Sequence, residues 1–169
     1  MIAIDPGLRG CGVAAFNHLV PDKRLVYATW VQNPIVIGRG PHVWRPMADA
    51  VFKELKHLPA PYLSKVCVEM PKVYPGMPKT DINDLLDLAG VLGAIVSHPW
   101  ALGVVEWFYP QDWKGQVPKA TMNARVKERL TAEERQAIFS VGAKDHNTLD
   151  AIGIGLHSLG RLERKRVYG

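Results

Sequence analysis

The opening stretch, MIAIDPGLRGCGVAAF, contains two short apolar runs separated by a glycine-rich turn. Each run has the length of a β-strand and is too short for a helix, so the stretch predicts two antiparallel strands. RLVYATWVQ follows with the β-branched and aromatic residues that strands favour, and it predicts a third strand of the same meander. Asp5 is unusual because it places a carboxylate within the first strand, directly before a Pro-Gly turn. An aspartate there can simply cap the turn, so Asp5 alone does not identify a site.

After the meander, helices and strands alternate. In order, the sequence predicts a helix over residues 46–57, a strand over 65–70, a helix over 81–97, a strand over 101–108, a basic loop over 109–120, a helix over 121–130 with Thr121 as its N-cap, and a helix over 145–162. The helix between the third and fourth strands favours parallel pairing of the fourth strand with the first. This pattern is typical of an α/β fold, in which helices flank a five-stranded mixed sheet.

The composition is that of a single globular domain over residues 1–169. Hydrophobic residues make up 47% and charged residues 22%, and no internal repeat or low-complexity linker divides the chain. Lys and Arg outnumber Asp and Glu by 21 to 16. The net charge of +5 therefore favours a polyanionic partner such as nucleic acid.

The cysteines and histidines form no recognisable zinc site. Cys11 and Cys67 each lie in an apolar strand-like run, so we interpret both as reduced core residues. The six histidines are scattered and do not combine with the cysteines at zinc-binding spacing.

The sequence shows neither a signal region nor an apolar segment of about 18 residues, so we expect a cytoplasmic protein without a membrane partner.

Three acidic residues from separate segments form the candidate site. Asp5 lies in the first strand and Glu69 ends the fourth, so parallel pairing would bring both carboxylates to one edge of the sheet. Asp150 lies in the last predicted helix, where His146 and Asn147 precede it by four and three residues and share its face. Converging carboxylates repel one another unless a cation lies among them, and a pair of divalent metal ions is the ordinary solution.

These segments resemble the RuvC-type Holliday junction resolvases of the RNase H-like superfamily. IAIDPGLRGCGVA is similar to the first motif of the family, VCVEMP to its second and HNTLDAIGIGL to its last. DLLDLAGVLGAIV and FYPQDWKGQVPK stand where the family has its central helix and its strand-then-lysine segment, so the likeness spans residues 2–162. It implies an RNase H-like fold and a metal-dependent endonuclease that resolves four-way DNA junctions by paired symmetric nicks, leaving a 5′ phosphate and a 3′ hydroxyl.

The resemblance also implies a ligand set. The ligands for two Mg²⁺ ions, which Mn²⁺ can replace, are Asp5, Glu69, Asp150 and one residue near the start of the last helix. The family usually has an acid or a histidine three residues before its last aspartate, where this chain has Asn147. His146 is the favoured fourth ligand and would also be catalytic. Asn147 could instead coordinate through its amide oxygen, and Asp145 would require a later helix start.

Contacts with branched DNA are implied for two basic segments. Lys119, as a catalytic residue, and Lys114 would place positive charge beside the scissile phosphate, although either could be a solvated loop lysine. Lys72 and Lys79 would bind phosphates in the loop after Glu69. Tyr74 in the same loop would stack on an unpaired base, with ordinary loop packing as the alternative.

Two further parts of the surface have predicted roles. The helix over residues 81–98 is apolar on more than one face, and the resembling proteins pair through this helix, so we expect a homodimer. The basic end of the chain begins at Arg161. Two interpretations of it stay open: contact with a phosphate backbone, and favourable interaction with the end of a helix dipole.

Three other functions also stay open. A different RNase H-like nuclease would use the same site on flaps, forks or RNA/DNA hybrids. An ATPase-type relative of the actin and sugar-kinase fold would need two such domains. A junction-binding module without activity would keep the fold, although three buried carboxylates are costly when no metal neutralises them.

Overall fold

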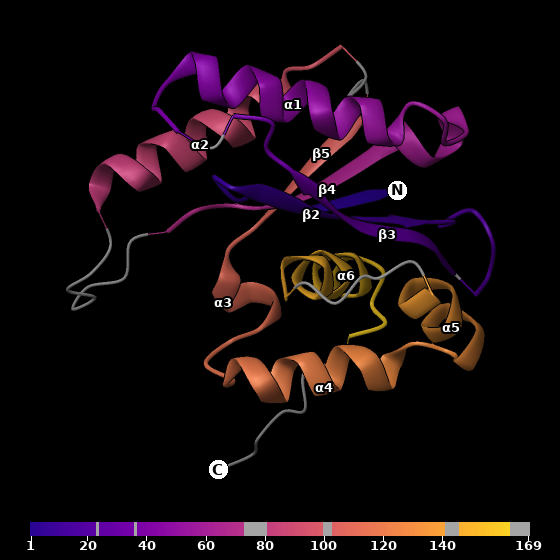
Figure 1. The fold of residues 1–169 in the computed structure, drawn as a ribbon. Coiled ribbons are helices and arrows are strands. Elements are labelled where there is room, and N and C mark those ends of the chain that lie inside the picture. Colours follow the sequence, from indigo (N-terminus) through magenta and orange to yellow (C-terminus); the bar gives the residue numbers. More distant parts are fainter. Residues whose placement is uncertain (23, 36, 73–80, 100–102, 141–145, 163–169) are drawn as a thin grey trace.

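The structure is a computed structural model of the 169-residue chain. It describes all residues except 23, 36, 73–80, 100–102, 141–145 and 163–169, and except the side chains of residues 137, 139, 140 and 146. The chain forms one twisted sheet with helices on both faces (Figure 1).

The sheet has five strands in the order β3-β2-β1-β4-β5. The strands are β1 (Ile2–Asp5), β2 (Gly10–Phe16), β3 (Leu25–Gln32), β4 (Lys65–Glu69) and β5 (Val104–Phe108). The first three strands form an antiparallel meander, whereas β4 pairs parallel with both β1 and β5. The predicted mixed sheet and the predicted parallel pairing of the first and fourth strands are confirmed.

Helices cover the two faces of the sheet as separate layers (Figure 1). One face carries α1 (Pro41–Leu55) and α2 (Ile82–Val96). The other carries α6 (His146–Ser158), with α3 (Pro110–Trp113), α4 (Lys119–Arg129) and α5 (Ala132–Ser140) around it. A short 3-10 helix, Ala60–Ser64, precedes β4.

The strand β1 is buried on both faces because each face has its own apolar core. Ile2 and Ile4 pack in the cluster under α1 and α2, whereas Ala3 packs in the cluster under α6. Successive strand residues point to opposite faces, so a strand between two helical layers is apolar at nearly every position. Cys11 and Cys67 are both free and buried, as predicted.

The first helix begins earlier than residue 46, so that predicted boundary is wrong. It starts at Pro41, after Gly40 with φ of 84°. Proline suits the first turn of a helix, where its missing N–H would have had no partner in the helix. Pro46 lies inside the helix instead, and the buried face formed by Val43, Met47 and Val51 holds the helix across it.

Two predictions between β5 and α5 also need correction. The predicted basic loop over residues 109–120 contains α3, whose first turn is closed by the Asp112 carboxylate accepting from the Tyr109 N–H at 2.8 Å. The next helix begins at Lys119 with Pro118 at its N-cap, so Thr121 is not the cap.

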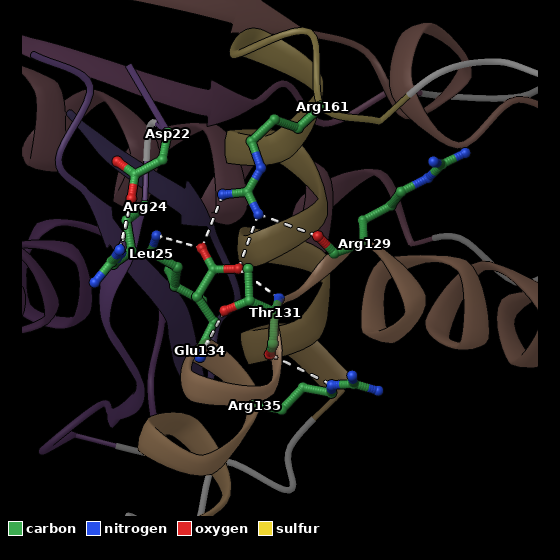
Figure 2. Close-up of polar contacts among 8 residues, drawn as sticks. All are labelled: Asp22, Arg24, Leu25, Arg129, Thr131, Glu134, Arg135 and Arg161. Atoms are coloured by element: carbon green, nitrogen blue, oxygen red, sulfur yellow. Dashed lines mark hydrogen bonds and ion pairs between the residues drawn. The ribbon is translucent and has the colours of Figure 1, made fainter. Parts of the chain in front are cut away.

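Helix α5 was not anticipated, because its short sequence has no clear apolar stripe. A buried carboxylate holds it in place (Figure 2). Glu134 accepts hydrogen bonds from the backbone N–H groups of Leu25 and Thr131 and forms a two-pronged ion pair with Arg161. Arg161 is therefore bound inside the protein, which replaces both of the open interpretations of this residue.

The last helix ends at Ser158 rather than at residue 162. Gly160 has φ of 71°, a left-handed conformation that favours glycine. The N–H of Arg161 bonds to the carbonyl of Leu156, and the N–H of Gly160 bonds to that of His157. These two bonds define a Schellman motif, which ends the helix.

The described helices contain no segment with both the length and the apolar composition needed to cross a membrane.

Candidate active site

Two of the predicted carboxylates lie at the same edge of the sheet. Asp5 ends β1 and Glu69 ends β4. The parallel register pairs Ile4 with Val68, so the next residue of each strand is Asp5 or Glu69. Parallel strands present their carboxyl ends at one edge, which brings these two side chains together as expected from the sequence.

The third carboxylate comes from the helix that packs on this part of the sheet. Asp150 lies in the first half of α6, and both it and Asp5 are only 7% exposed. Gly12, the partner of Asp5 in β2, allows the close approach. A Cβ atom at Gly12 would lie 1.9 Å from the carbonyl oxygen of Asn147, so any larger residue would push α6 away from the strand.

Burial and mutual repulsion shape the electrostatics of the cluster. Desolvation raises the pKa of Asp5 well above its ordinary value, and the charges of Glu69 and Asp150 raise it further. Desolvation also raises the pKa of Glu69. Three carboxylates thus share one water-poor region in which their negative charges are not fully balanced.

Lysines from the segment after β5 supply part of the missing positive charge. The Nζ atom of Lys114 lies 3.2 Å from Glu69 Oε2 and 3.8 Å from Asp150 Oδ2. Lys119 Nζ lies 3.9 Å from the same oxygen of Asp150. Burial alone would lower the pKa of Lys114, but the neighbouring carboxylates outweigh it and the pKa is raised. Lys114 is therefore charged at neutral pH.

Trp113 belongs to the site although the sequence analysis did not select it. Its Nε1–H donates to Glu69 Oε2 at 2.7 Å, and its ring is 2% exposed. The ammonium of Lys114 lies 4.7 Å from the centre of the Trp113 ring. The available signal was an aromatic residue directly before Lys114, but nothing in the local pattern shows that its N–H reaches β4.

Solved structures with a similar fold include three proteins whose alignments cover nearly the whole of this chain. T. thermophilus RuvC in complex with a Holliday junction substrate aligns over 94% of this chain and 93% of its own, with 19% identity and a TM-score of 0.54. The Fowlpox virus resolvase, in complex with Holliday junction DNA, aligns over 95% and 99%, with 14% identity and a TM-score of 0.56. The yeast mitochondrial Holliday junction resolvase Ydc2 aligns over 95% and 80%, with 10% identity and a TM-score of 0.61.

This chain has the RNase H-like fold of RuvC. The similarity is one of structure: the sequence matches no protein-family model and no curated protein.

Mg²⁺ fits the donor atoms that the RNase H-like fold brings together here. Asp5, Glu69 and Asp150 offer hard carboxylate oxygens, which Mg²⁺ prefers, and the pKa of Asp5 is raised by burial and then by the charges of Glu69 and Asp150, which a bound cation would oppose. Among the residues that the structure describes, however, no three His, Cys, Asp or Glu side chains are close enough to hold one ion. Lys114 lies between Glu69 and Asp150 instead, so a metal would compete with its ammonium group.

The remaining predicted residues lie partly outside the described chain. His146 is the first residue of α6, but its side chain is not described, and neither are Asp145, Tyr74 and Lys79. Lys72 is described: its Nζ donates to Gln111 Oε1 at 2.8 Å and lies 5.2 Å from the centre of the Tyr109 ring. Lys72 thus lies beside the segment that contributes Trp113 and Lys114.

Proposed function

We propose that this protein is a metal-dependent endonuclease that resolves four-way DNA junctions by paired symmetric nicks, leaving a 5′ phosphate and a 3′ hydroxyl. The observation that carries the proposal is the meeting of Asp5, Glu69 and Asp150 beside Lys114, on a fold shared with resolvases. Two of the similar structures hold Holliday junction DNA, which makes branched DNA the first substrate to test.

In the proposed reaction, Asp5, Glu69 and Asp150 would hold Mg²⁺, with His146 as the favoured fourth ligand. Bound Mg²⁺ would make a water more acidic and stabilise the charge that develops on the leaving oxygen. Lys114 and Lys119 carry positive charge beside the same carboxylates and would bind oxygens of the scissile phosphate. The Trp113 N–H orients Glu69, which cannot then turn away from the site.

A homodimer formed through α2 would suit a substrate that needs two symmetric nicks. Ile82, Leu86 and Ala89 recur at helical spacing on the exposed side of α2, and Ile82 and Leu86 are 67% and 63% exposed. Gly93 continues this stripe, and nothing lies within 4 Å of the place where its Cβ would be. An apolar helix face with a glycine at its end allows a second helix to approach closely.

A cleavage assay with and without Mg²⁺ tests the activity. Labelled four-way junction, flap, duplex and RNA/DNA hybrid are incubated with the wild type, with Asp5→Asn and with Asp22→Asn. Asp22 is the control because it is an exposed acid paired with Arg24, away from the cluster. We expect Mg²⁺-dependent paired nicks in the junction, and a loss of at least about a hundredfold for Asp5→Asn alone. Equal cutting by Asp5→Asn, or no cutting by the wild type, would refute the proposal.

A junction-binding module without activity is the second candidate, because Lys114 already neutralises part of the cluster. The same assay separates the two functions when junction binding is measured beside cleavage. A wild type that binds the junction tightly in Mg²⁺ or Mn²⁺ and leaves it intact would favour the binding module. Preferential cutting of flaps, forks or hybrids would instead point to another RNase H-like nuclease.

A further inference from the structure

A continuous hollow leads away from the carboxylate cluster along α4. It consists of two adjoining cavities of about 540 and 430 Å³. The residues that line both cavities are Gln111, Lys114, Gly115, Gln116, Val117 and Met122. The larger cavity ends at Lys119 and Asp150, and the smaller one ends at Arg125 and Arg129. We call this hollow the α4 groove.

The charges along the α4 groove favour an anionic occupant. Four basic residues line it, namely Lys114, Lys119, Arg125 and Arg129, against two acids, Asp150 and Glu128. Asp150 is already compensated by the two lysines at the inner end. At the outer end, therefore, the lining contains the guanidinium groups of Arg125 and Arg129 and the single carboxylate of Glu128.

Arg125 is the basic residue best placed to meet a ligand. Its side chain is half-buried, and within the described chain it has neither a hydrogen bond nor an ion pair. Glu128 does not neutralise it, although the two residues are three apart on the same helix. Arg129 is exposed, and Figure 2 shows its side chain directed away from the Glu134 cluster while its carbonyl accepts from Arg161.

The shape of the α4 groove agrees with a chain rather than a compact ligand. Each cavity alone has the volume of a small-molecule site, and the two adjoin along six shared lining residues. The lining combines the apolar side chains of Val117 and Met122 with the charged ones. A nucleic-acid strand has this combination, because its sugars and bases are apolar on their faces and its phosphates recur along one side.

We propose that the α4 groove holds the backbone of the cleaved nucleic-acid strand beyond the scissile phosphate, with Arg125 contacting a phosphate of that strand. This inference rests on the proposed function, because the carboxylate cluster defines where the scissile phosphate lies. It adds a binding path and a positioning residue that the carboxylate cluster itself does not include.

The first test measures the salt dependence of junction binding in EDTA, where no cleavage occurs. Arg125→Gln is compared with the wild type and with Arg45→Gln, an exposed arginine on α1 on the other side of the sheet. Each lost phosphate contact reduces the magnitude of the slope of log affinity against log salt by about 0.9, so a dimer that loses one contact per subunit changes by about 1.8. We expect that change for Arg125→Gln, with an affinity about tenfold weaker at low salt, and no change for Arg45→Gln. Equal slopes for the two variants would overturn the inference.

The second test locates the strand by cross-linking. Gln116 is exposed and lines both cavities, so Gln116→Cys can carry a thiol-reactive photo-crosslinker. Cys11 and Cys67 are fully buried, and burial raises the pKa of each thiol to about 12, so the reagent will select residue 116. We expect cross-links to the cleaved strand within a few nucleotides of the nick. Cross-links only to distant arms of the junction would overturn the inference.

The two proposals fail in different ways. If the junction is bound with the Arg125-dependent slope and cross-links at residue 116, but is not cut in Mg²⁺, the α4 groove stands only as a strand-binding path, and the nuclease proposal falls. If the junction is cut but Arg125→Gln binds like Arg45→Gln, the nuclease proposal stands and the α4 groove falls.

Discussion

At the scale of single residues, one uncharged side chain contacts an acid of the candidate site. Glu69 ends its strand beside two other carboxylates and would gain by turning away from them into water. Trp113 opposes that movement, because its buried Nε1–H donates to Glu69 Oε2. Partners of this kind fix the orientation of a ligand without touching the substrate.

We predict that Trp113→Phe will weaken cleavage without unfolding the protein. Phenylalanine keeps most of the packing but removes the N–H that orients Glu69, which typically lowers metal affinity or activity by about 10- to 100-fold. The Mg²⁺ concentration for half-maximal rate should rise, a change that a purely structural residue would not cause. Trp107→Phe is the control, because Trp107 is 47% exposed on β5. Identical Mg²⁺ titrations for the two variants would contradict the positioning role.

At the scale of elements, α5 shows how a helix of weak intrinsic preference is held by one buried carboxylate. Glu134 is 2% exposed and connects α5 to β3 through the Leu25 N–H and to the end of α6 through Arg161 (Figure 2). Burial alone would raise the pKa of Glu134, but Arg161 and the two backbone donors outweigh it and the pKa is lowered. The charged form is therefore the one that stabilises the fold.

We predict that Glu134→Gln will lower the free energy of unfolding by about 3 kcal/mol at pH 7, since it removes the carboxylate charge that forms the ion pair with Arg161 and turns an amide N–H₂ toward other donors. Urea unfolding measures the difference, with exposed Glu133→Gln as the matched control.

The difference in unfolding free energy between the wild type and Glu134→Gln should also depend on pH. Because the pKa of Glu134 is lower in the folded state than its ordinary value of 4.5, its stabilisation is complete above that value and is lost as the pH falls through the folded pKa. The difference between wild type and Glu134→Gln should therefore shrink on acidification below about pH 4.5. A difference that stays constant down to the acid transition would show that the Glu134 charge is not responsible.

At the scale of the whole molecule, the exposed stripe on α2 gives the proposed dimer a concrete test. Leu86→Glu places a charge in the centre of the stripe, where a partner helix would bury it. We expect sedimentation to show a dimer for the wild type and a monomer at about 10 µM for the variant, with the melting temperature of the monomer little changed because Leu86 is already exposed.

Leu19→Glu is the control for this prediction, since Leu19 is 68% exposed and lies in the turn between β2 and β3. A wild type that sediments as a monomer at the same concentration, or a Leu86→Glu variant that remains dimeric, would contradict an interface at α2.

Features that depend on residues close together in the chain could be predicted from the sequence. Apolar runs and turn residues identified the strands, a crossover helix identified the parallel pairing of β1 with β4, and the helix predicted over residues 81–97 is α2 (Ile82–Val96). The convergence of Asp5 and Glu69 followed from that pairing alone. Which residue near His146 completes the site, and which residues act in catalysis, stay predictions.

Features that depend on contacts between distant segments could be seen only in the folded structure. The donor for Glu69 comes from Trp113, 44 residues away, and the acceptor that holds Leu25 comes from Glu134, 109 residues away. Helix α5 has no periodic pattern of its own, and neither of the two interpretations left open for Arg161, phosphate contact and the helix dipole, includes its ion pair with buried Glu134. Local periodicity and turn chemistry reach only a few residues along the chain, whereas the pairing of buried polar groups is set by how the layers pack.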